Sequence, residues 1–422
     1  MTMHAFNSTA LFSAPLSMAA GDSLVIGQDG FVYGQGDLFT GLNSGPRNIV
    51  VSGTAATAGF AVTLGAFQNE AYGTRFTVTD TGHVHGYTGL LYTGSNLLLD
   101  NSGTISGDDT AIYLDGGTAF DANRIVNSGT IVGGYGIAST LSRTSAAVIV
   151  NTGVIEGNLG AAIELRDAIE VGDSILNAGR IVGDVFMGGG ADLYDGRGGQ
   201  LNGTVHGDSG NDLFRPGASE EAFDGGSGTD TLDFRTGGGA VELALDGSWE
   251  STGWAEGDTY TGFERVIGTT QADRIGGNSA ANVLSGGAGA DQLFGRAGND
   301  TLIGGGGIDV LSGGSGNDSF QFNRLAECGD SLTDFSSAGA GDNDRFLISA
   351  DFGGGLAAGA LAAGLFVSRA DNLAQDANDR FIFRTADRTL WFDADGTGTG
   401  AGVLVATLQA GATMTAADIV IF

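Results

Sequence analysis

Residues 268–321 read GTTQADRIG-GNSAANVLS-GGAGADQLF-GRAGNDTLI-GGGGIDVLS-GGSGNDSFQ, which is six consecutive segments of nine residues. Their shared pattern is G-G-x-G-x-D-x-U-x, where U is a large apolar residue. Glycines at positions one, two and four permit a tight, partly left-handed turn. The x-U-x part is then a short strand whose apolar side chain faces a core. The stretch therefore predicts stacked turns that each carry one aspartate.

An earlier block repeats the pattern as GDSGNDLFR-PGASEEAFD-GGSGTDTLD over residues 207–233, and MGGGADLYD over 187–195 is a looser copy. Two nine-residue segments complete one turn of about 18 residues, so aspartates at that spacing stack on one side. The pairs with this spacing are Asp212 with Asp230, Asp291 with Asp309, and Asp300 with Asp318. Carboxylate and carbonyl oxygens at a flexible turn select a hard cation, and Ca²⁺ is the expected one.

These segments resemble the RTX (repeats-in-toxin, haemolysin-type) calcium-binding β-roll, the resemblance extending over roughly residues 187–422. The resemblance implies calcium ligands at the glycines and aspartates of the repeat. The expected metal-binding residues are Asp212, Gly225, Gly228, Asp230, Gly286, Gly289, Asp291, Gly298, Asp300, Gly304, Gly307, Asp309, Gly313, Gly316 and Asp318. Two segments depart from the pattern: 268–276 lacks two glycines, and 277–285 has Asn282 at the aspartate position. We expect weak or absent calcium at those two turns.

A longer repeat occupies the first half of the chain. NSGTISG begins at Asn101, NSGTIVG at Asn127, NTGVIEG at Asn151 and NAGRIVG at Asn177, and a further step of 24 reaches LNGTVHG at Leu201. Each repeat offers three short β-type segments between Gly, Asn or Asp residues, as a right-handed parallel β-helix requires. The central Ile or Val of each block is expected to point inward. The fold class is therefore all-β, a parallel β-helix continuing into a β-roll.

Composition excludes several classes of protein. The chain has 422 residues with 77 Gly and 3 Pro, and its formal charge is −31 with every basic residue an Arg. Scarce Pro and aperiodic Gly exclude collagen, and 41% hydrophobic residues are enough for a core. Nucleic acid is a poor partner for so acidic a surface. Cys328 is the single cysteine, so no intrachain disulfide forms.

The N-terminal segment has no Lys or Arg before Arg47, which argues against a cleaved secretory signal. No apolar run reaches the roughly 18 residues that span a bilayer. The chain ends in TAADIVIF, which resembles the uncleaved C-terminal signal of type I (ABC-transporter) substrates. This resemblance implies export through a type I apparatus to the outside of a Gram-negative bacterium. A buried edge strand is the alternative interpretation of DIVIF.

These observations predict four regions. They are residues 1–75, a cap or irregular first rungs; 76–206, the β-helix; 207–321, the β-roll with an interrupting segment 234–267; and 322–422, a C-terminal secretion domain of antiparallel strands.

The predicted function is that of a secreted, calcium-dependent, non-catalytic solenoid at the cell surface, in a surface layer or matrix, or in adhesion. Self-association and a cell-surface polysaccharide are the candidate partners. The alternative is a polysaccharide lyase or epimerase with a β-helix catalytic module. The chain has no H-E-x-x-H motif, and the positions aligned with His85 on successive rungs form no catalytic cluster. Those positions are Ser106, Val132, Glu156, Val182 and His206. His83 and His85 are expected to face outward around Val84, and no role is assigned to them.

Overall fold

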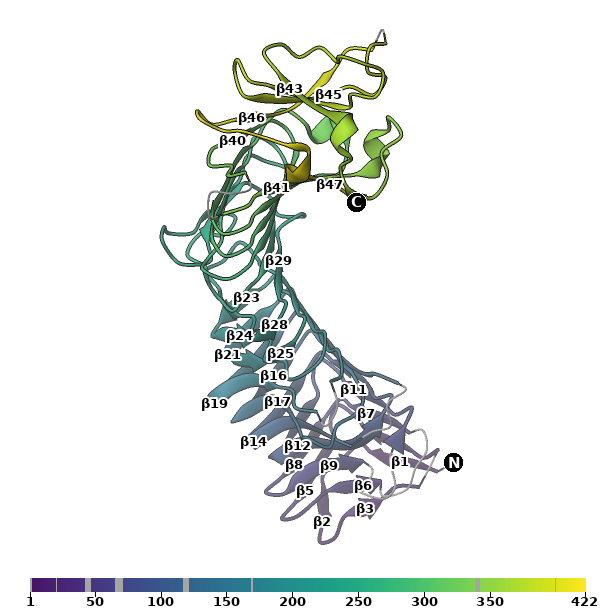
Figure 1. Cartoon of the computed structure of the whole chain (residues 1–422). Helices are drawn as coiled ribbons and strands as arrows, with labels where there is room; N and C mark the ends of the chain where they lie inside the picture. The colour runs from purple at the N-terminus through teal and green to yellow at the C-terminus, as the bar shows by residue number, and fades with distance from the viewer. Residues whose placement is uncertain are drawn as a thin grey trace. The chain divides into compact units, whose positions relative to one another are not determined.

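The computed structural model describes residues 2–19, 21–41, 47–64, 71–116, 121–167, 170–337, 342–398 and 400–422. Nearly all of the regular structure is β, and most strand pairs are parallel (Figure 1). The chain divides into two compact units, Met1–Asp230 with Asp258–Gly262, and Thr231–Gly257 with Phe263–Phe422. No helix in the described ranges is long and apolar enough to cross a membrane.

The first unit is a parallel β-helix whose successive rungs pair strand on strand. One face consists of β1 (Met3–Phe6), β4 (Ser23–Ile26), β7 (Asn48–Val51), β11 (Arg75–Val78), β13 (Leu98–Asn101), β15 (Asn123–Asn127), β18 (Ala147–Asn151), β20 (Ser174–Asn177), β22 (Leu193–Asp195) and β26 (Leu213–Arg215). Residues 1–75 thus contribute rungs to this stack, as Figure 1 shows for β1 and β7.

Two further faces complete the rungs. The second holds β2 (Ala10–Phe12), β5 (Phe31–Gly34), β8 (Thr54–Thr57), β12 (His83–Ser95), β14 (Thr104–Asp115), β16 (Thr130–Gly133), β19 (Val154–Glu164), β21 (Arg180–Phe186), β23 (Gln200–Asn202), β24 (Thr204–His206), β27 (Ala222–Asp224) and β32 (Thr259–Thr261). The third holds β3 (Leu16–Ser17), β6 (Phe39–Gly41), β9 (Phe60–Leu64), β10 (Ala71–Tyr72), β17 (Tyr135–Ser139) and the later halves of the long strands of the second face. A short pair, β25 (Ser209–Gly210) with β28 (Ser227–Gly228), lies at the later turns.

Apolar columns fill this β-helix. Ile105, Ile131, Ile155 and Ile181 are in register and fully buried, which confirms the inward orientation predicted for the repeat. The mid-repeat residues Ile112, Ile137 and Ile163 form a second buried column.

The predicted fifth repeat at Leu201 is wrong. The rungs of 24 to 26 residues end with the one at Asn177. The next rungs are shorter: Ile175 pairs with Tyr194, and Tyr194 pairs with Phe214. Because these later rungs are shorter, Leu201 pairs with Ile181 instead of Asn177.

Because the rungs shorten, the predicted alignment of His206 with Val182 is also wrong. Val182 pairs with Asn202. His206 pairs with Phe186, and the centroids of their stacked rings are 4.6 Å apart.

The second unit has two strand columns over a core of Leu, Ile, Val and Phe. The first column is β29 (Thr231–Asp233), β33 (Arg265–Ile267), β35 (Val283–Ala288), β37 (Thr301–Gly306), β39 (Ser319–Phe322), β41 (Arg345–Ile348) and β47 (Ile419–Ile421). The second is β30 (Val241–Ala244), β34 (Arg274–Gly276), β36 (Gln292–Ala297), β38 (Val310–Ser315), β40 (Asp330–Leu332) and β46 (Val403–Leu408).

The C-terminal strands are only partly antiparallel, unlike the prediction. β46, β45 (Thr389–Phe392) and β44 (Phe381–Arg384) pair antiparallel, whereas β43 (Phe366–Arg369) pairs parallel with β44. β47 lies between parallel β41 and antiparallel β42 (Gly359–Ala360), so the terminal DIVIF segment is not at an edge. Short 3-10 helices occur at η1 (Leu325–Glu327), η2 (Ala350–Phe352), η3 (Ala363–Leu365) and η4 (Ala416–Asp418).

Part of the interrupting segment packs against the roll through a tryptophan. β30 pairs with β34, and β31 (Thr252–Gly253) pairs antiparallel with β30. The Trp249 ring lies between the guanidinium groups of Arg274 and Arg296, at 4.1 and 4.6 Å from its centroid. Arg296 occupies a glycine position of its repeat with φ +83°, an unfavourable backbone region for a non-glycine residue. This contact gives a physical reason for arginine at that position.

Candidate metal centre

Each complete nonapeptide forms the same turn. The fourth-position glycines have φ between +118° and +142°, in the region that favours glycine. They are Gly228, Gly289, Gly298, Gly307 and Gly316. A side chain at Gly228 or Gly307 would also collide with a carbonyl oxygen of the preceding turn. Both the turn and the close stacking therefore require glycine here.

The sixth-position aspartates form hydrogen-bonded columns. One carboxylate oxygen, Oδ1, accepts the backbone N–H of the sixth-position residue one turn earlier, at 2.7 or 2.8 Å. The donor and acceptor pairs are Asp212 to Asp230, Asp273 to Asp291, Asn282 to Asp300, Asp291 to Asp309, and Asp300 to Asp318. The three aspartate pairs named from the 18-residue spacing are thus neighbours in space.

In several of these aspartates the other carboxylate oxygen, Oδ2, is buried and has no hydrogen-bond partner. This holds for Asp212, Asp291, Asp300, Asp309 and Asp318. Burial raises the pKa of Asp212, Asp291 and Asp300 to about 7, and the stacked neighbouring aspartates add to the effect. A buried carboxylate oxygen without a partner is unfavourable unless a positive charge lies beside it.

The carbonyl groups of the first-position glycines converge on these same oxygens. A Cβ atom on Gly207 would collide with both Oδ2 of Asp212 and the carbonyl oxygen of Gly225, one turn later. A Cβ on Gly295 would likewise meet Oδ2 of Asp300 and the Gly313 carbonyl oxygen. Each small space is bordered by a carboxylate and a carbonyl oxygen, which are the ligands that Ca²⁺ prefers. The residues present therefore fit a calcium ion.

The remaining first-position glycines also lie next to their aspartates. A Cβ on Gly225, Gly286, Gly304 or Gly313 would approach the carboxylate of Asp230, Asp291, Asp309 or Asp318 respectively. Asp230 is fully buried and accepts the Asp212 N–H.

The two atypical turns satisfy the side-chain oxygens at their sixth positions internally, although the Asn282 amide nitrogen is buried without a hydrogen-bond partner. Asp273 accepts hydrogen bonds from the backbone N–H groups of Val241 and Thr269 and from the Thr269 hydroxyl. Asn282 accepts the N–H of Asn278 at 2.8 Å through its Oδ1. Neither turn leaves a buried carboxylate oxygen without a partner, so neither presents the feature seen at the complete repeats.

An arginine occupies the start of the aspartate column in the first unit. The column extends upstream, because the N–H of Asp192 donates to Asp212 and the N–H of Asp173 donates to Asp192. Fully buried Arg143 donates to both Asp173 oxygens, at 2.9 and 2.5 Å, and its Nη2 lies 3.4 Å from Asp167. Sequence reasoning missed this arginine, since no repeat predicts its distance from Asp173.

The same reasoning missed the aspartates that follow the last repeats. Asp330 and Asp344 accept the N–H groups of Asp309 and Asp318, at 3.0 and 2.9 Å. Their spacings of 21 and 26 residues fall outside the nine-residue phase.

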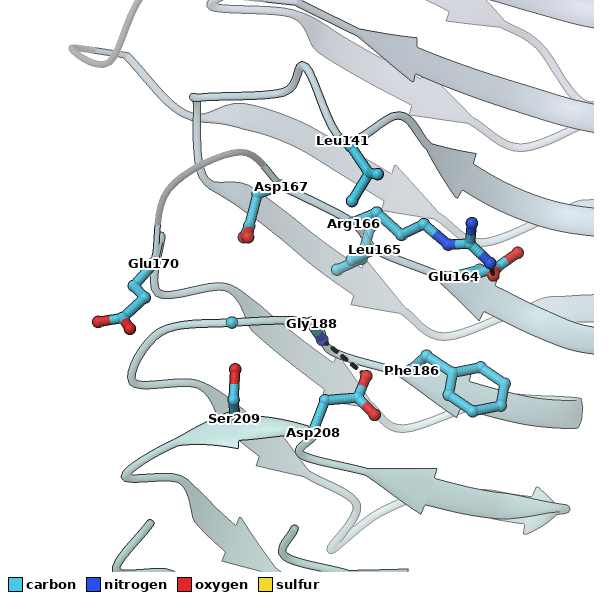
Figure 2. Close-up of a pocket in the computed structure, with 11 residues that line it drawn as sticks. Leu141, Glu164, Leu165, Arg166, Asp167, Glu170, Phe186, Gly188, Asp208 and Ser209 are labelled. Atoms are coloured by element: carbon cyan, nitrogen blue, oxygen red, sulfur yellow. Dashed lines mark hydrogen bonds and ion pairs between the residues drawn. The ribbon is translucent and has the colours of Figure 1, made fainter. Parts of the chain in front are cut away.

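A separate cavity of about 640 Å³ lies on the first unit, beside the first glycine turns (Figure 2). Its lining includes four carboxylates, those of Glu164, Asp167, Glu170 and Asp208. Arg166 in the lining forms an ion pair with Glu164, and the Gly188 N–H donates to Asp208 at 3.2 Å. The lining is therefore strongly acidic.

Histidines do not form a metal cluster in this structure. His83 is exposed, and His85 Nδ1 lies 3.0 Å from the Ser106 hydroxyl, on either side of buried Val84. Throughout the ranges that the structure covers, no three His, Cys, Asp or Glu side chains gather as a metal-binding group.

Comparison with known families identifies the repeats. Four copies of the RTX calcium-binding nonapeptide repeat match residues 197–232, 258–293, 267–302 and 294–321. These matches show that the chain carries RTX calcium-binding nonapeptide repeats, and calcium is the cation that such repeats bind.

Two solved structures are similar to parts of the chain. The R3 subunit of the mannuronan C5-epimerase AlgE6 from Azotobacter vinelandii is 30% identical, with 36% of this chain and 78% of that chain covered and a TM-score of 0.25. Extracellular lipase LipA from Serratia marcescens is 15% identical, with 67% and 46% covered and a TM-score of 0.17. No curated protein matches the chain.

Proposed function

We propose that the chain is a secreted, non-catalytic solenoid that folds on binding calcium and acts as a structural or adhesive protein at the cell surface, in a surface layer or in a matrix. The observation that carries the calcium part is the row of buried, unpartnered Oδ2 atoms at the stacked turns. The proposed ligands are these carboxylates, that of Asp230, and carbonyl oxygens of the turn glycines.

The calcium concentrations on the two sides of a cell envelope suit this role. Extracellular modules bind calcium with dissociation constants of roughly 10⁻⁴–10⁻³ M, which millimolar calcium outside a cell exceeds and cytosolic calcium does not reach. An ion that binds only the folded state stabilises that state. Export through a type I apparatus, the route of RTX proteins, would deliver an unfolded chain to the calcium that folds it, outside a Gram-negative bacterium.

An exposed apolar patch on the early rungs supports an interaction role. Phe31 and Tyr33 on β5 stack with ring centroids 6.5 Å apart, and each is 41% exposed. Leu11 on β2 is 78% exposed and pairs in register with Tyr33. Adjacent exposed aromatic and aliphatic side chains mark contact surfaces for another protein copy or for a sugar ring.

The proposal is tested by electron microscopy and circular dichroism in millimolar calcium, in magnesium and in EGTA. We expect ordered assemblies in calcium alone, and EGTA should remove β-structure from residues 207–321 first. The variant Phe31→Ser/Tyr33→Ser should bind calcium normally and fail to assemble, while Tyr87→Ser, also on an exposed aromatic, serves as control. Identical spectra with and without calcium would contradict calcium-dependent folding.

A polysaccharide-active enzyme is the second candidate, because the acidic cavity of Figure 2 is large enough for a sugar unit. Its four carboxylates disfavour an anionic glycan, since like charges repel in a partly desolvated site. Release of new sugar ends from a neutral glycan, abolished by Asp208→Asn, would support this candidate.

A further inference from the structure

The column that contains Asp291 and Asp309 continues beyond the repeats. The N–H of Asp309 donates to Oδ1 of Asp330 at 3.0 Å, just as the N–H of Asp291 donates to Oδ1 of Asp309 at 2.8 Å. Asp330 begins β40, after the last nonapeptide. A residue outside the nine-residue phase therefore takes the next position in the column.

Two unpartnered carboxylate oxygens meet at this position. Oδ2 of Asp309 and Oδ2 of Asp330 are both buried without a hydrogen-bond partner, in residues that are 0% and 1% exposed. A Cβ atom on Gly304 would collide with both oxygens, so they border the same small space. Burial, followed by the Asp309 and Glu327 carboxylates, raises the pKa of Asp330 to about 8. Two buried oxygens of this kind require a shared cation or a proton.

The neighbouring column ends differently. Asp344 accepts the Asp318 N–H through Oδ1, and its Oδ2 accepts the N–H of Ser336 at 2.7 Å. Asp334 accepts the N–H groups of Gly313 and Gly314 at 2.9 Å each. Backbone N–H groups thus bond both oxygens of Asp344, which offers no free oxygen comparable to Oδ2 of Asp330, and the unpartnered Oδ2 of Asp318 has no second one facing it from Asp344.

We propose that Asp309 and Asp330 together hold a divalent cation that closes their column beyond the nonapeptides. Hard carboxylate oxygens favour Ca²⁺ over softer metals. The proposal rests on calcium binding at the repeats and adds to them one site that the nine-residue pattern does not contain. Its second carboxylate comes from the C-terminal region.

The site connects calcium to strands that carry no repeat. β40 pairs with β38 of the roll and with β46, and the N–H of Gly329 donates to the carbonyl oxygen of Val405 at 2.8 Å. β46 in turn pairs with β45, and β45 with β44. A cation at Asp330 therefore fixes the strand on which this C-terminal sheet is built.

The test uses the full chain with calcium as the only added ligand. Equilibrium dialysis at saturating calcium should show one ion fewer bound to Asp330→Asn than to the wild type. Asp344→Asn, at the corresponding end of the other column, should bind as many ions as the wild type. Amide hydrogen exchange at residues 403–408 should be at least tenfold faster in calcium-loaded Asp330→Asn than in the calcium-loaded wild type, with no such change in the control.

Unchanged calcium stoichiometry in Asp330→Asn would overturn this site and leave calcium-dependent folding of the repeats intact. A wild type that binds no calcium would instead overturn the proposed function. If Asp330→Asn does not fold, an anomalous-scattering map of the calcium-bound wild type decides. Density between Asp309 and Asp330 supports the site, and its absence there with ions at other turns overturns it.

Discussion

The β-helix and the nonapeptide turns both contain buried columns of polar side chains. The columns of the β-helix are built from the amides of asparagines, and those of the nonapeptide turns from the carboxylates of aspartates. In the β-helix, Asn101, Asn127, Asn151 and Asn177 stack with each amide nitrogen donating to the next amide oxygen, at 2.7 to 2.9 Å. In the turns, aspartates stack with one oxygen bonded and the other without a partner. An amide both donates and accepts, so successive asparagines bond to one another and only Oδ1 of the first, Asn101, is buried without a partner. An ionised carboxylate only accepts, so its second oxygen is left for a cation or a proton.

Arg143 is the exception that links the two kinds of column. Its guanidinium neutralises Asp173, the aspartate that heads the column leading to Asp192 and Asp212. Arg143 thus supplies to Asp173 the positive charge that we propose a bound Ca²⁺ supplies to the aspartates of the later turns. The charge of one side chain in each rung therefore decides whether a column is neutralised within the chain, as Asp173 is by Arg143, or leaves buried carboxylate oxygens for a cation.

Replacing Arg143 should have the largest effect on the free energy of unfolding. Arg143→Met leaves Asp173 and Asp167 buried without their partner, so we expect a loss of about 3–5 kcal/mol in the unfolding free energy of the first unit. Urea denaturation in EGTA measures this, with exposed Arg124→Met as control. Restoration of part of the loss by Arg143→Met/Asp173→Asn is expected, and wild-type stability in Arg143→Met would contradict the role of this ion pair.

Placing a carboxylate in the asparagine column should have the next largest effect. Asn127→Asp removes the donor to the Asn151 amide oxygen and buries a charge, at a cost of about 3 kcal/mol. Hydrogen exchange of residues 123–151 measures it, and exposed Ser128→Asp should change little. If calcium restored full stability to Asn127→Asp, any stacked aspartate would suffice for binding, and the glycine turn would be dispensable.

Replacing an aspartate of the nonapeptide turns by asparagine should have a smaller effect on stability, and the sign of that effect should depend on calcium. Asp300→Asn keeps the acceptor for the Asn282 N–H and removes a buried charge, so the second unit should gain about 1 kcal/mol in EGTA. In calcium at a hundred times its dissociation constant the wild type gains about 2.7 kcal/mol from this site, so the variant should be about 1.7 kcal/mol less stable than the wild type. Denaturation in both conditions measures the two values, with exposed Asp351→Asn as control. The same sign in both conditions would argue against calcium at this turn.

The parts of the structure that repeat were predictable from the sequence. A fixed phase of nine residues places Asp291 beside Asp309, and the Asn-x-Gly-x-Ile blocks place Ile131 over Ile105. Both follow because a regular solenoid converts equal spacing in sequence into neighbours in space.

The parts that end or interrupt the repeats were not predictable in this way. Arg143 reaches Asp173 across 30 residues that follow no period. Asp330 and Asp344 join their columns at spacings set by the segments that follow the last repeats. Rungs shorten after Asn177, which shifted the predicted partner of Leu201. In each case the contact depends on loop length, which side-chain pattern does not encode.

The hydrogen bonds within the aspartate columns have a direction. Each carboxylate accepts from the turn before it, so a turn is complete only when the turn after it is in place. Asp344, which accepts the Asp318 N–H through Oδ1 and the Ser336 N–H through Oδ2, is the acceptor at the C-terminal end of one column. Truncations from the two ends of the repeats are consequently not equivalent: loss of the last turn leaves a backbone N–H of its predecessor without its acceptor, whereas loss of the first leaves a carboxylate oxygen of its successor without its donor.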